Sequence, residues 1–254
     1  MTGITIAITN QKGGVAKTTT TVNLSASLAS MGYRVLIIDM DPQGHAGEHL
    51  GVKKEQTILE VLTKQTVIQN NIIKTYKQNL YCLPSNLQLG QFNQLNPTQY
   101  QYALKGALAE VKNDFDFILI DCQPSLSLLT LNALTASDYV ILPVQAEFFA
   151  LDGLSQLVYT LKEIQNRLHP TLGVLGILLT MFDRRNKLSL EVRQELTQNF
   201  RESLFKTLIP RNIKLAEAPS FNLAIGDYDQ GSAGAESYRN LAKEILKKLN
   251  LDKN

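Results

Sequence analysis

The sequence has few of the residues that mark disulfide-rich, metal-binding or membrane proteins. Its two cysteines, Cys82 and Cys122, lie far apart and without metal-ligand spacing. A disulfide framework is therefore not expected, and a reducing compartment is indicated. No apolar run is long enough to cross a bilayer, and no basic segment followed by an apolar run opens the chain, so neither an anchor nor a signal peptide is predicted. The cytoplasm is the expected location.

Strong net charge and domain linkers are also missing. The net charge of +2 is too small to indicate nucleic-acid binding by itself, so any basic surface must come from local clustering. No repeat and no Pro- or Ser-rich linker divides the 254 residues, of which 44% are hydrophobic and 19% charged. This composition is typical of a globular protein with a sizeable core. We expect a single domain over residues 1–254.

What the chain does contain, near its start, is a glycine-containing loop between a strand and a helix. Residues 4–8 form an apolar strand, residues 10–16 form the loop, and a helix is expected to begin at Lys17. The N–H groups of such a loop and the positive end of the helix dipole together make a cradle for phosphate. Lys17 would reach the outer phosphates, and the Thr18 hydroxyl would bind Mg²⁺.

The loop departs from the strict phosphate-binding pattern at two positions, where Gln11 and Ala16 replace glycine. If the backbone at residue 16 needs a positive φ, alanine costs about 1 kcal/mol there. An additional lysine, Lys12, lies five residues before Lys17. The loop residues expected to bind the nucleotide are Lys12, Gly13, Gly14, Val15, Ala16, Lys17, Thr18 and Thr19.

Two predicted buried strands lead into aspartates. The strand at residues 33–39 ends in Asp39 and is followed by Asp41, and the strand at residues 115–122 contains Asp121. Ligands of open α/β sheets bind at the carboxyl ends of the strands, so these carboxylates are expected beside the phosphates. We predict that Asp121 holds Mg²⁺ through a bound water. Asp39 is expected near the metal or its waters.

Strands and helices alternate along the rest of the chain. Further strands are predicted at residues 80–85, 138–144 and 172–180. Helices are predicted at residues 19–31, 104–111, 190–200 and 235–249, with Ser189 as the N-cap of the third. A further long helix is expected to end near Arg167. Residues 45–80 show helical periodicity, which includes Ile72 and Ile73. Right-handed βαβ repetition predicts the α/β fold of a P-loop NTPase: a single doubly wound, mostly parallel sheet of about seven or eight strands, with helices on both faces.

Six segments together resemble the ParA/MinD family of ATPases, which carry a deviant Walker A loop. They are residues 11–19, 39–44, 117–124, 128–138, 143–153 and 209–220. The resemblance runs over nearly the full length and is to the small, Soj-like ParA type. It implies an ATPase that uses ATP and Mg²⁺ and has a slow basal rate.

The resemblance assigns catalytic roles to three residues. Lys12 would reach across a dimer interface to the nucleotide of the partner subunit, so that ATP is enclosed in a sandwich dimer. Lys12 and Lys17 would offset the charge that develops on the phosphates, and Asp41 would orient the attacking water.

The resemblance also implies contacts to the adenine base. Asp183 follows the strand at 172–180, where the family places a polar residue beside the base. Pro210 and Asn212 lie within residues 208–220, which resemble the family's final strand and adenine-side loop.

The family's ATP-bound dimer binds DNA without sequence preference, and a ParB-like or cargo-adaptor protein stimulates its ATPase. The chain would thus position a DNA or protein cargo on the nucleoid. For any single cation a solvated surface charge is the favoured interpretation, whereas the cluster near the C-terminus is the favoured DNA contact. The candidate DNA contacts are Arg184, Arg185, Lys206, Arg211, Lys214, Arg239, Lys243, Lys247 and Lys248.

Three alternatives stay open from the sequence. A MinD-like ATPase would bind membrane through a C-terminal amphipathic helix, but the tail at residues 247–254 is short and has no aromatic residue. A relative of nitrogenase iron protein would need paired cysteines. A nucleotide-dependent scaffold with little turnover is compatible with Ala16. The cargo, whether plasmid, chromosome origin, carboxysome or chemoreceptor array, is not encoded in a readable motif.

Overall fold

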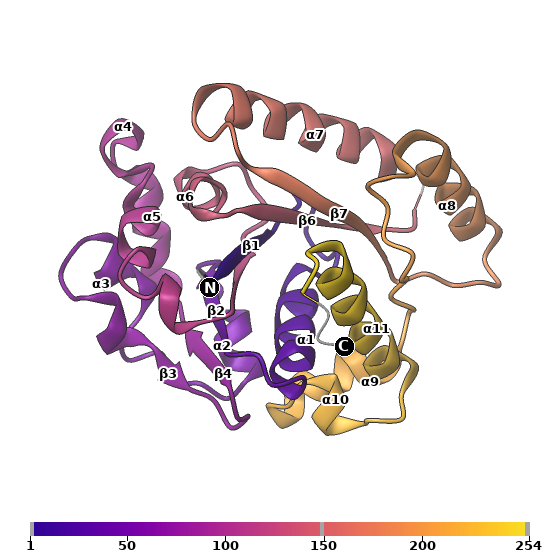
Figure 1. Ribbon diagram of the computed structural model, residues 1–254, viewed down its shortest axis with the longest axis horizontal. Coiled ribbons are helices and arrows are strands. Elements are labelled where there is room, and N and C mark those ends of the chain that lie inside the picture. Colours follow the sequence, from indigo (N-terminus) through magenta and orange to yellow (C-terminus); the bar gives the residue numbers. More distant parts are fainter. Residues whose placement is uncertain (1–2, 148–149, 252–254) are drawn as a thin grey trace.

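A seven-stranded sheet forms the centre of the computed structural model, which describes residues 3–147 and 150–251 (Figure 1). The strand order is β3-β4-β2-β5-β1-β6-β7, and every neighbouring pair is parallel except β3 with β4. This confirms the predicted fold. The strands are β1 (Ile4–Ile8), β2 (Val35–Met40), β3 (Ile73–Lys74), β4 (Leu80–Leu83), β5 (Phe117–Cys122), β6 (Tyr139–Gln145) and β7 (Gly173–Thr180).

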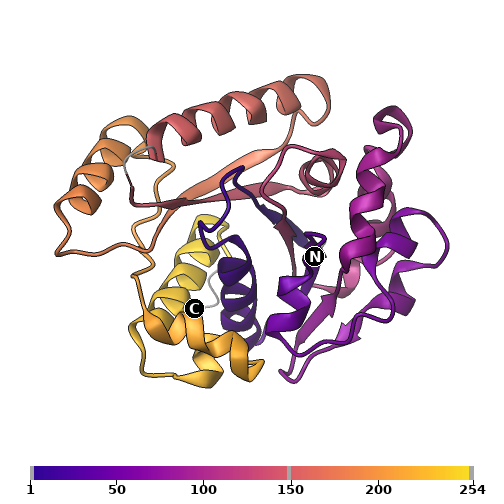
Figure 2. The same cartoon turned by 180° about the vertical axis from the view of Figure 1, so that it is seen from behind.

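Helices cover both faces of the sheet, and Figure 2 shows the same two layers from behind. One face carries α1 (Lys17–Ser30), α2 (His45–His49), α9 (Ile213–Glu217), α10 (Ile225–Tyr228) and α11 (Ala233–Lys248). The other carries α3 (Ile58–Leu62), α4 (Pro97–Tyr100), α5 (Ala103–Leu108), α6 (Leu128–Ala136), α7 (Ala150–Arg167) and α8 (Lys187–Phe200). Short 3₁₀ helices lie at η1 (Ile68–Asn71), η2 (Leu87–Gln94), η3 (Lys112–Asp114) and η4 (Ala218–Phe221).

The central strands are apolar without interruption because both of their faces are buried. In β1, Ile6 and Ile8 pack under α1 and α11, whereas Ala7 belongs to the core under α6 and α7. In β2, Ile37 packs in the same core as Ile6 and Ile8, and Ile38 packs in the same core as Ala7. Successive side chains of a strand point to opposite faces of the sheet. Because both faces of this parallel sheet are covered by helices, every position of a central strand needs an apolar residue.

The register of the parallel strands brings the two predicted acids together. Asp39 of β2 lies directly beside Asp121 of β5, and Asp121 lies beside Ile8 of β1. The loop that follows Ile8 therefore leaves the sheet at the edge where both carboxylates lie. This is the edge at which open α/β sheets bind ligands.

Three local predictions were wrong. Helix α8 begins at Lys187, and its N-cap is Asn186, whose side chain accepts from the Leu188 N–H at 3.0 Å; Ser189 is buried one turn later. Residues 208–220 do not form a strand beyond a single bridge between Pro210 and Phe182. Ile73 belongs to a two-residue antiparallel edge strand and not to a helix, because so short a strand carries no readable period.

The apolar face of the last helix packs on the core. Leu241 and Ile245 of α11 are fully buried, and α11 lies beside α1 in both views (Figures 1 and 2). The chain end from Asp252 onward lies outside the described residues. Within the described ranges, no helix combines the length and apolar character needed to span a membrane.

Candidate active site

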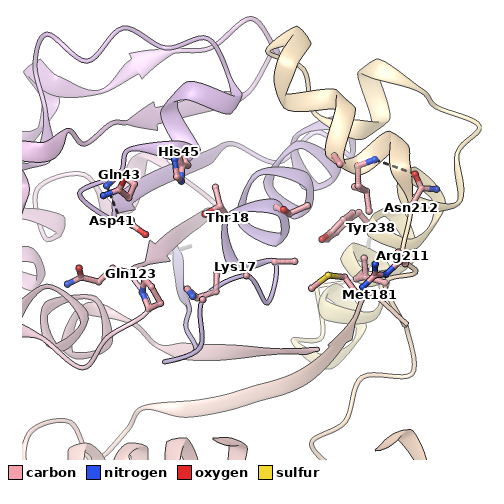
Figure 3. A pocket seen from close by; sticks show the side chains of 18 of the residues that line it. Lys17, Thr18, Asp41, Gln43, His45, Gln123, Met181, Arg211, Asn212 and Tyr238 are labelled. Atoms are coloured by element: carbon pink, nitrogen blue, oxygen red, sulfur yellow. Dashed lines mark hydrogen bonds between the residues drawn. The ribbon is translucent and has the colours of Figure 1, made fainter. Parts of the chain in front are cut away.

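A cavity of about 790 Å³ opens at the carboxyl edge of the sheet (Figure 3). Elements from both ends of the chain contribute to it, which places the loop after β1 opposite the C-terminal helices. The lining residues are Gly13, Gly14, Ala16, Lys17, Thr18, Thr19, Asp41, Pro42, Gln43, His45, Gln123, Pro124, Ser125, Met181, Ile209, Pro210, Arg211, Asn212, Leu215, Ala216 and Tyr238.

The loop before α1 has the geometry of a phosphate cradle. Ala16, the N-cap residue, has φ 68° and ψ 35° and makes no side-chain cap, and Gly14 has φ 76°. The first N–H groups of a helix have no acceptor within it, so those of α1 remain available for an anion. Two of the predicted loop residues, Lys12 and Val15, lie outside the lining of the cavity. Val15 is buried, and its carbonyl accepts from the Thr180 hydroxyl at 3.1 Å.

Both lysines of the loop are engaged within the chain. The Lys17 ammonium donates to the Lys12 carbonyl at 2.9 Å, and the Lys12 ammonium forms an ion pair with Glu147. Burial lowers the pKa of Lys17, an effect that Asp121 opposes. The loop is therefore closed on itself. Lys17 lines the cavity, whereas Lys12 is outside the lining and is held by Glu147.

Asp121 accepts hydrogen bonds from two threonines of α1. The Thr18 hydroxyl donates to its Oδ2 at 2.7 Å, and the Thr21 hydroxyl donates to its Oδ1 at 3.1 Å. Asp121 is fully buried. Burial, with the Asp39 carboxylate second, raises the pKa of Asp121 to about 8. A buried carboxylate beside a hydroxyl is the kind of oxygen donor set that Mg²⁺ takes, so these residues fit the predicted metal site.

The turn after β2 separates the roles of Asp39 and Asp41. Asp39 is fully buried and accepts from the N–H groups of Asp41 at 3.1 Å, Ala46 at 3.0 Å and Gly47 at 3.3 Å. It thus fixes the turn and the start of α2; a role near the metal stays a prediction. Asp41 lines the cavity, and its Oδ1 accepts from the Gln43 N–H at 3.0 Å.

The structure brings two of the three predicted base contacts to the cavity. Pro210 and Asn212 line it, and the Asn212 side chain also caps α9 by accepting from the Leu215 N–H at 3.3 Å. Asp183 lies outside the lining and accepts from Arg185 Nε at 3.2 Å, and its hydrogen bonds with Arg185 lower the pKa of Asp183. Met181, with φ 49°, lines the cavity instead.

Several lining residues were not predicted. Met181 directly follows β7 and Gln123 directly follows β5, so the rule that ligands bind at strand ends could have found both. His45 lies four residues after Asp41 and could have been found by its proximity to that turn. Tyr238 lies in the middle of α11, and its hydroxyl bonds with the Thr20 hydroxyl at 3.2 Å; nothing in its local sequence distinguishes it.

The predicted DNA contacts fall into different surroundings. A second hollow of about 1010 Å³ adjoins the cavity at Pro210 and Arg211, and it gathers the exposed cations Arg184, Arg185, Arg193, Lys206 and Arg211. Lys243 and Lys247 line a further hollow of about 830 Å³ with Lys206 and Lys248.

Four of the predicted DNA contacts already have partners in the chain. Arg185 forms an ion pair with Asp183 at 3.2 Å, although the Arg185 side chain is 90% exposed. Lys214 forms an ion pair with Glu217 at 2.9 Å, and Arg239 donates to the Gln230 carbonyl at 2.9 Å. The Lys248 ammonium donates to the Leu175 carbonyl at 2.9 Å, and burial lowers its pKa.

The two cysteines are buried on β4 and β5, which β2 separates. Burial raises the pKa of both thiols. They do not form the paired set that a shared iron–sulfur cluster would need.

Comparison with known proteins agrees with this site. A family model described as an AAA domain matches residues 3–174. The sporulation initiation inhibitor protein Soj of Bacillus subtilis (strain 168) is 50% identical over 248 residues, which cover 96% of this chain and 98% of that protein. The chain belongs to the ParA/MinD family of ATPases. Within it, the chromosome-partitioning ATPase Soj of Treponema pallidum (strain Nichols) is 44% identical over 246 residues, covering 96% of this chain and 97% of that protein.

A solved structure has the same fold and a bound nucleotide. It is described as cobyrinic acid a,c-diamide synthase from Mycobacterium smegmatis with bound ADP and magnesium, and it matches with a TM-score of 0.84 and 34% identity. The match covers 98% of this chain and 96% of that one. Family membership and fold thus agree with the features of the cavity.

Proposed function

We propose that this chain is a Mg²⁺-dependent partitioning ATPase that forms a sandwich dimer with ATP and binds DNA without sequence preference in that state. A ParB-like or cargo-adaptor partner stimulates its slow hydrolysis and releases it, so that a DNA or protein cargo is positioned on the nucleoid. One observation carries the proposal: a single cavity joins the phosphate loop and Asp41, with Asp121 hydrogen-bonded to Thr18 at its wall.

The chain's own groups support binding of a triphosphate. The uncapped first turn of α1 offers N–H donors, and Lys17, which now donates to the Lys12 carbonyl, would donate to a phosphate oxygen instead. Thr18, and Asp121 through a bound water, would hold magnesium, which would neutralise phosphate charge. The base would lie between Met181 and the segment around Pro210 and Asn212; Figure 3 shows Met181 and Asn212 on the side of the cavity opposite to Asp41.

Asp41 is held in place to orient the water that attacks the outermost phosphate. Its N–H donates to Asp39, its carbonyl accepts from the Ser85 hydroxyl, and its Oδ1 accepts from the Gln43 N–H. These contacts fix the backbone and one carboxylate oxygen. The other oxygen, Oδ2, can then accept a hydrogen bond from water.

Lys12 supports the dimer. Its side chain is 53% exposed at the edge of the loop, and a lysine there can serve a phosphate outside its own subunit. Lys12→Ala should therefore lose ATP-dependent dimerisation in light scattering, whereas dimerisation equal to that of the parent would rule out the role in trans.

The function is tested by Asp41→Ala. This variant should bind ATPγS with the affinity of the parent and lose about 10²-fold or more of kcat, the usual effect of removing a group that handles the proton or water. Asp183→Ala is the matched control, because Asp183 lies outside the cavity and should leave both values unchanged. Hydrolysis at the parental rate by Asp41→Ala would remove that residue from the mechanism. If the parent did not hydrolyse ATP in the presence of DNA, the chain would be a nucleotide-dependent scaffold and not an ATPase.

A further inference from the structure

His45 lies in the cavity without a role in the reaction as described so far. It is the first residue of α2, it is exposed, and it lines the cavity together with Asp41 and Gln123 (Figure 3). Among the described residues, its side chain has no hydrogen bond or ion pair to another group. A polar side chain that enters a ligand cavity without a protein partner is available to the ligand.

The backbone around His45 is held by contacts on both sides. Gly44 has φ 68°, and a Cβ there would lie 2.6 Å from the Ser85 carbonyl oxygen, so the tight turn before His45 requires glycine. After it, the Asp39 carboxylate accepts from the N–H groups of Ala46 and Gly47. The imidazole is therefore presented to the cavity by a fixed turn and helix start.

The surroundings of His45 place it at the phosphate end of the cavity. In Figure 3 its ring extends from α2 toward Thr18 and Asp41, on the opposite side from Met181 and Asn212. An imidazole carries at least one N–H donor in either protonation state. A donor at this end can reach an outer phosphate oxygen but not the base.

We propose that His45 is a further catalytic residue, which donates a hydrogen bond to the outermost phosphate of ATP. This rests on the proposed function, and it explains how the cavity can distinguish a nucleoside triphosphate from the diphosphate product. Preorganised donors aimed at developing charge act mainly in the transition state. The His45 N–H therefore contributes to the affinity for the triphosphate and more strongly to its hydrolysis.

The test compares His45→Ala, His45→Asn and His45→Gln in binding and in turnover. His45→Ala should weaken ATPγS binding about tenfold, the size expected for a hydrogen bond to a charged group, and leave ADP binding within about twofold, because ADP lacks the outermost phosphate. Its kcat should fall by about 10²-fold. Asn and Gln place an amide donor where Nδ1 and Nε2 lie, so one of them should restore most of the activity and identify the nitrogen.

Glu48→Gln is the matched control, because Glu48 is an exposed residue of the same helix that does not line the cavity. It should behave as the parent in every assay. An unchanged ratio of ATPγS to ADP affinity in His45→Ala, or an equal loss for both nucleotides, would overturn the inference. The ratio is measured without turnover, so it decides the role of His45 even if the parent proves not to hydrolyse ATP.

Discussion

The Lys12 ammonium forms an ion pair with Glu147 of its own chain. The lysine predicted to serve a partner's nucleotide thus has a partner at the end of β6 in its own subunit. The two side chains are 53% and 31% exposed, and ion pairs this open to solvent contribute about 1 kcal/mol or less. The ion pair can therefore disfavour dimerisation, because it holds Lys12 within its own subunit, but it is too weak to prevent Lys12 from leaving Glu147.

The first prediction concerns Glu147→Gln, which removes the charge that holds Lys12. The variant should dimerise at an ATP concentration up to about fivefold lower than the parent, the factor that about 1 kcal/mol allows. Light scattering against ATP concentration measures the midpoint. Glu163→Gln is the control, because Glu163 pairs with Arg167 on α7 and does not contact Lys12. A midpoint equal to that of the parent would show that the ion pair does not oppose dimerisation.

The second prediction concerns Ala16, which holds the left-handed conformation that glycine adopts without strain. Ala16→Gly should raise the free energy of unfolding by about 1 kcal/mol and the melting temperature by about 2–4 °C. Ala26→Gly, in the right-handed interior of the same helix, should lower the free energy of unfolding by about 1 kcal/mol. Melting curves without nucleotide give both values, and lower stability in Ala16→Gly would contradict the strain.

These residues show which features the sequence could predict. The phosphate loop, the buried strands and the positions of Asp41 and Asp121 follow from rules that act over a few residues: apolar runs form strands, and strand ends carry ligands. The cost of alanine at position 16 could be stated in advance because a positive φ strains any residue with a Cβ. Beyond these rules, the prediction of the fold required only the alternation of strands and helices along the chain.

The features that could not be predicted depend on contacts between distant segments, or on a choice between two neighbouring residues that suit the same role. Asn186 and Ser189 are both good N-caps, and only the packing of α8, with Ser189 buried, decides between them. Pro210 meets Phe182, but Asn212 then starts α9 by capping it, so the apolar run does not become a strand. The choice of Met181 over Asp183 depends on where the chain turns after β7.

The third prediction compares Arg184 and Arg185 with Lys248, all three of which are predicted DNA contacts. Arg184 and Arg185 line the basic hollow and are exposed, and the ion pair of Arg185 with Asp183 is too open to solvent, with the Arg185 side chain 90% exposed, to hold it from a phosphate. The double variant Arg184→Ala/Arg185→Ala should therefore weaken ATP-dependent DNA binding and lower the salt slope by about 1 for each phosphate that is no longer neutralised. Lys248→Ala should bind DNA as the parent does, since the Lys248 ammonium already donates to the Leu175 carbonyl. Binding isotherms at several salt concentrations measure both slopes, and equally weakened binding in the two variants would contradict this division.

The fourth prediction concerns His49, a buried residue that joins α2 to the C-terminal part of the chain. Its Nε2 lies 3.1 Å from the Leu223 carbonyl, so the neutral ring donates there. Burial lowers the pKa of His49 from 6.5 to about 4. Because the folded pKa is below the unfolded one, the stability that this group contributes is complete above pH 6.5 and is lost as the pH falls toward 4.

The expected decrease in unfolding free energy attributable to His49 between about pH 7 and pH 5 is about 2 kcal/mol. His49→Gln keeps an amide donor for the Leu223 carbonyl and does not titrate, so its unfolding free energy should fall by about 2 kcal/mol less than that of the parent over this interval. Urea unfolding of both proteins at the two pH values measures the difference, and all other titrating groups cancel because the two chains share them. If the unfolding free energies of the two proteins decreased equally, the His49 ring would accept a proton while the protein stays folded. The contact with Leu223 would then not depend on a neutral imidazole.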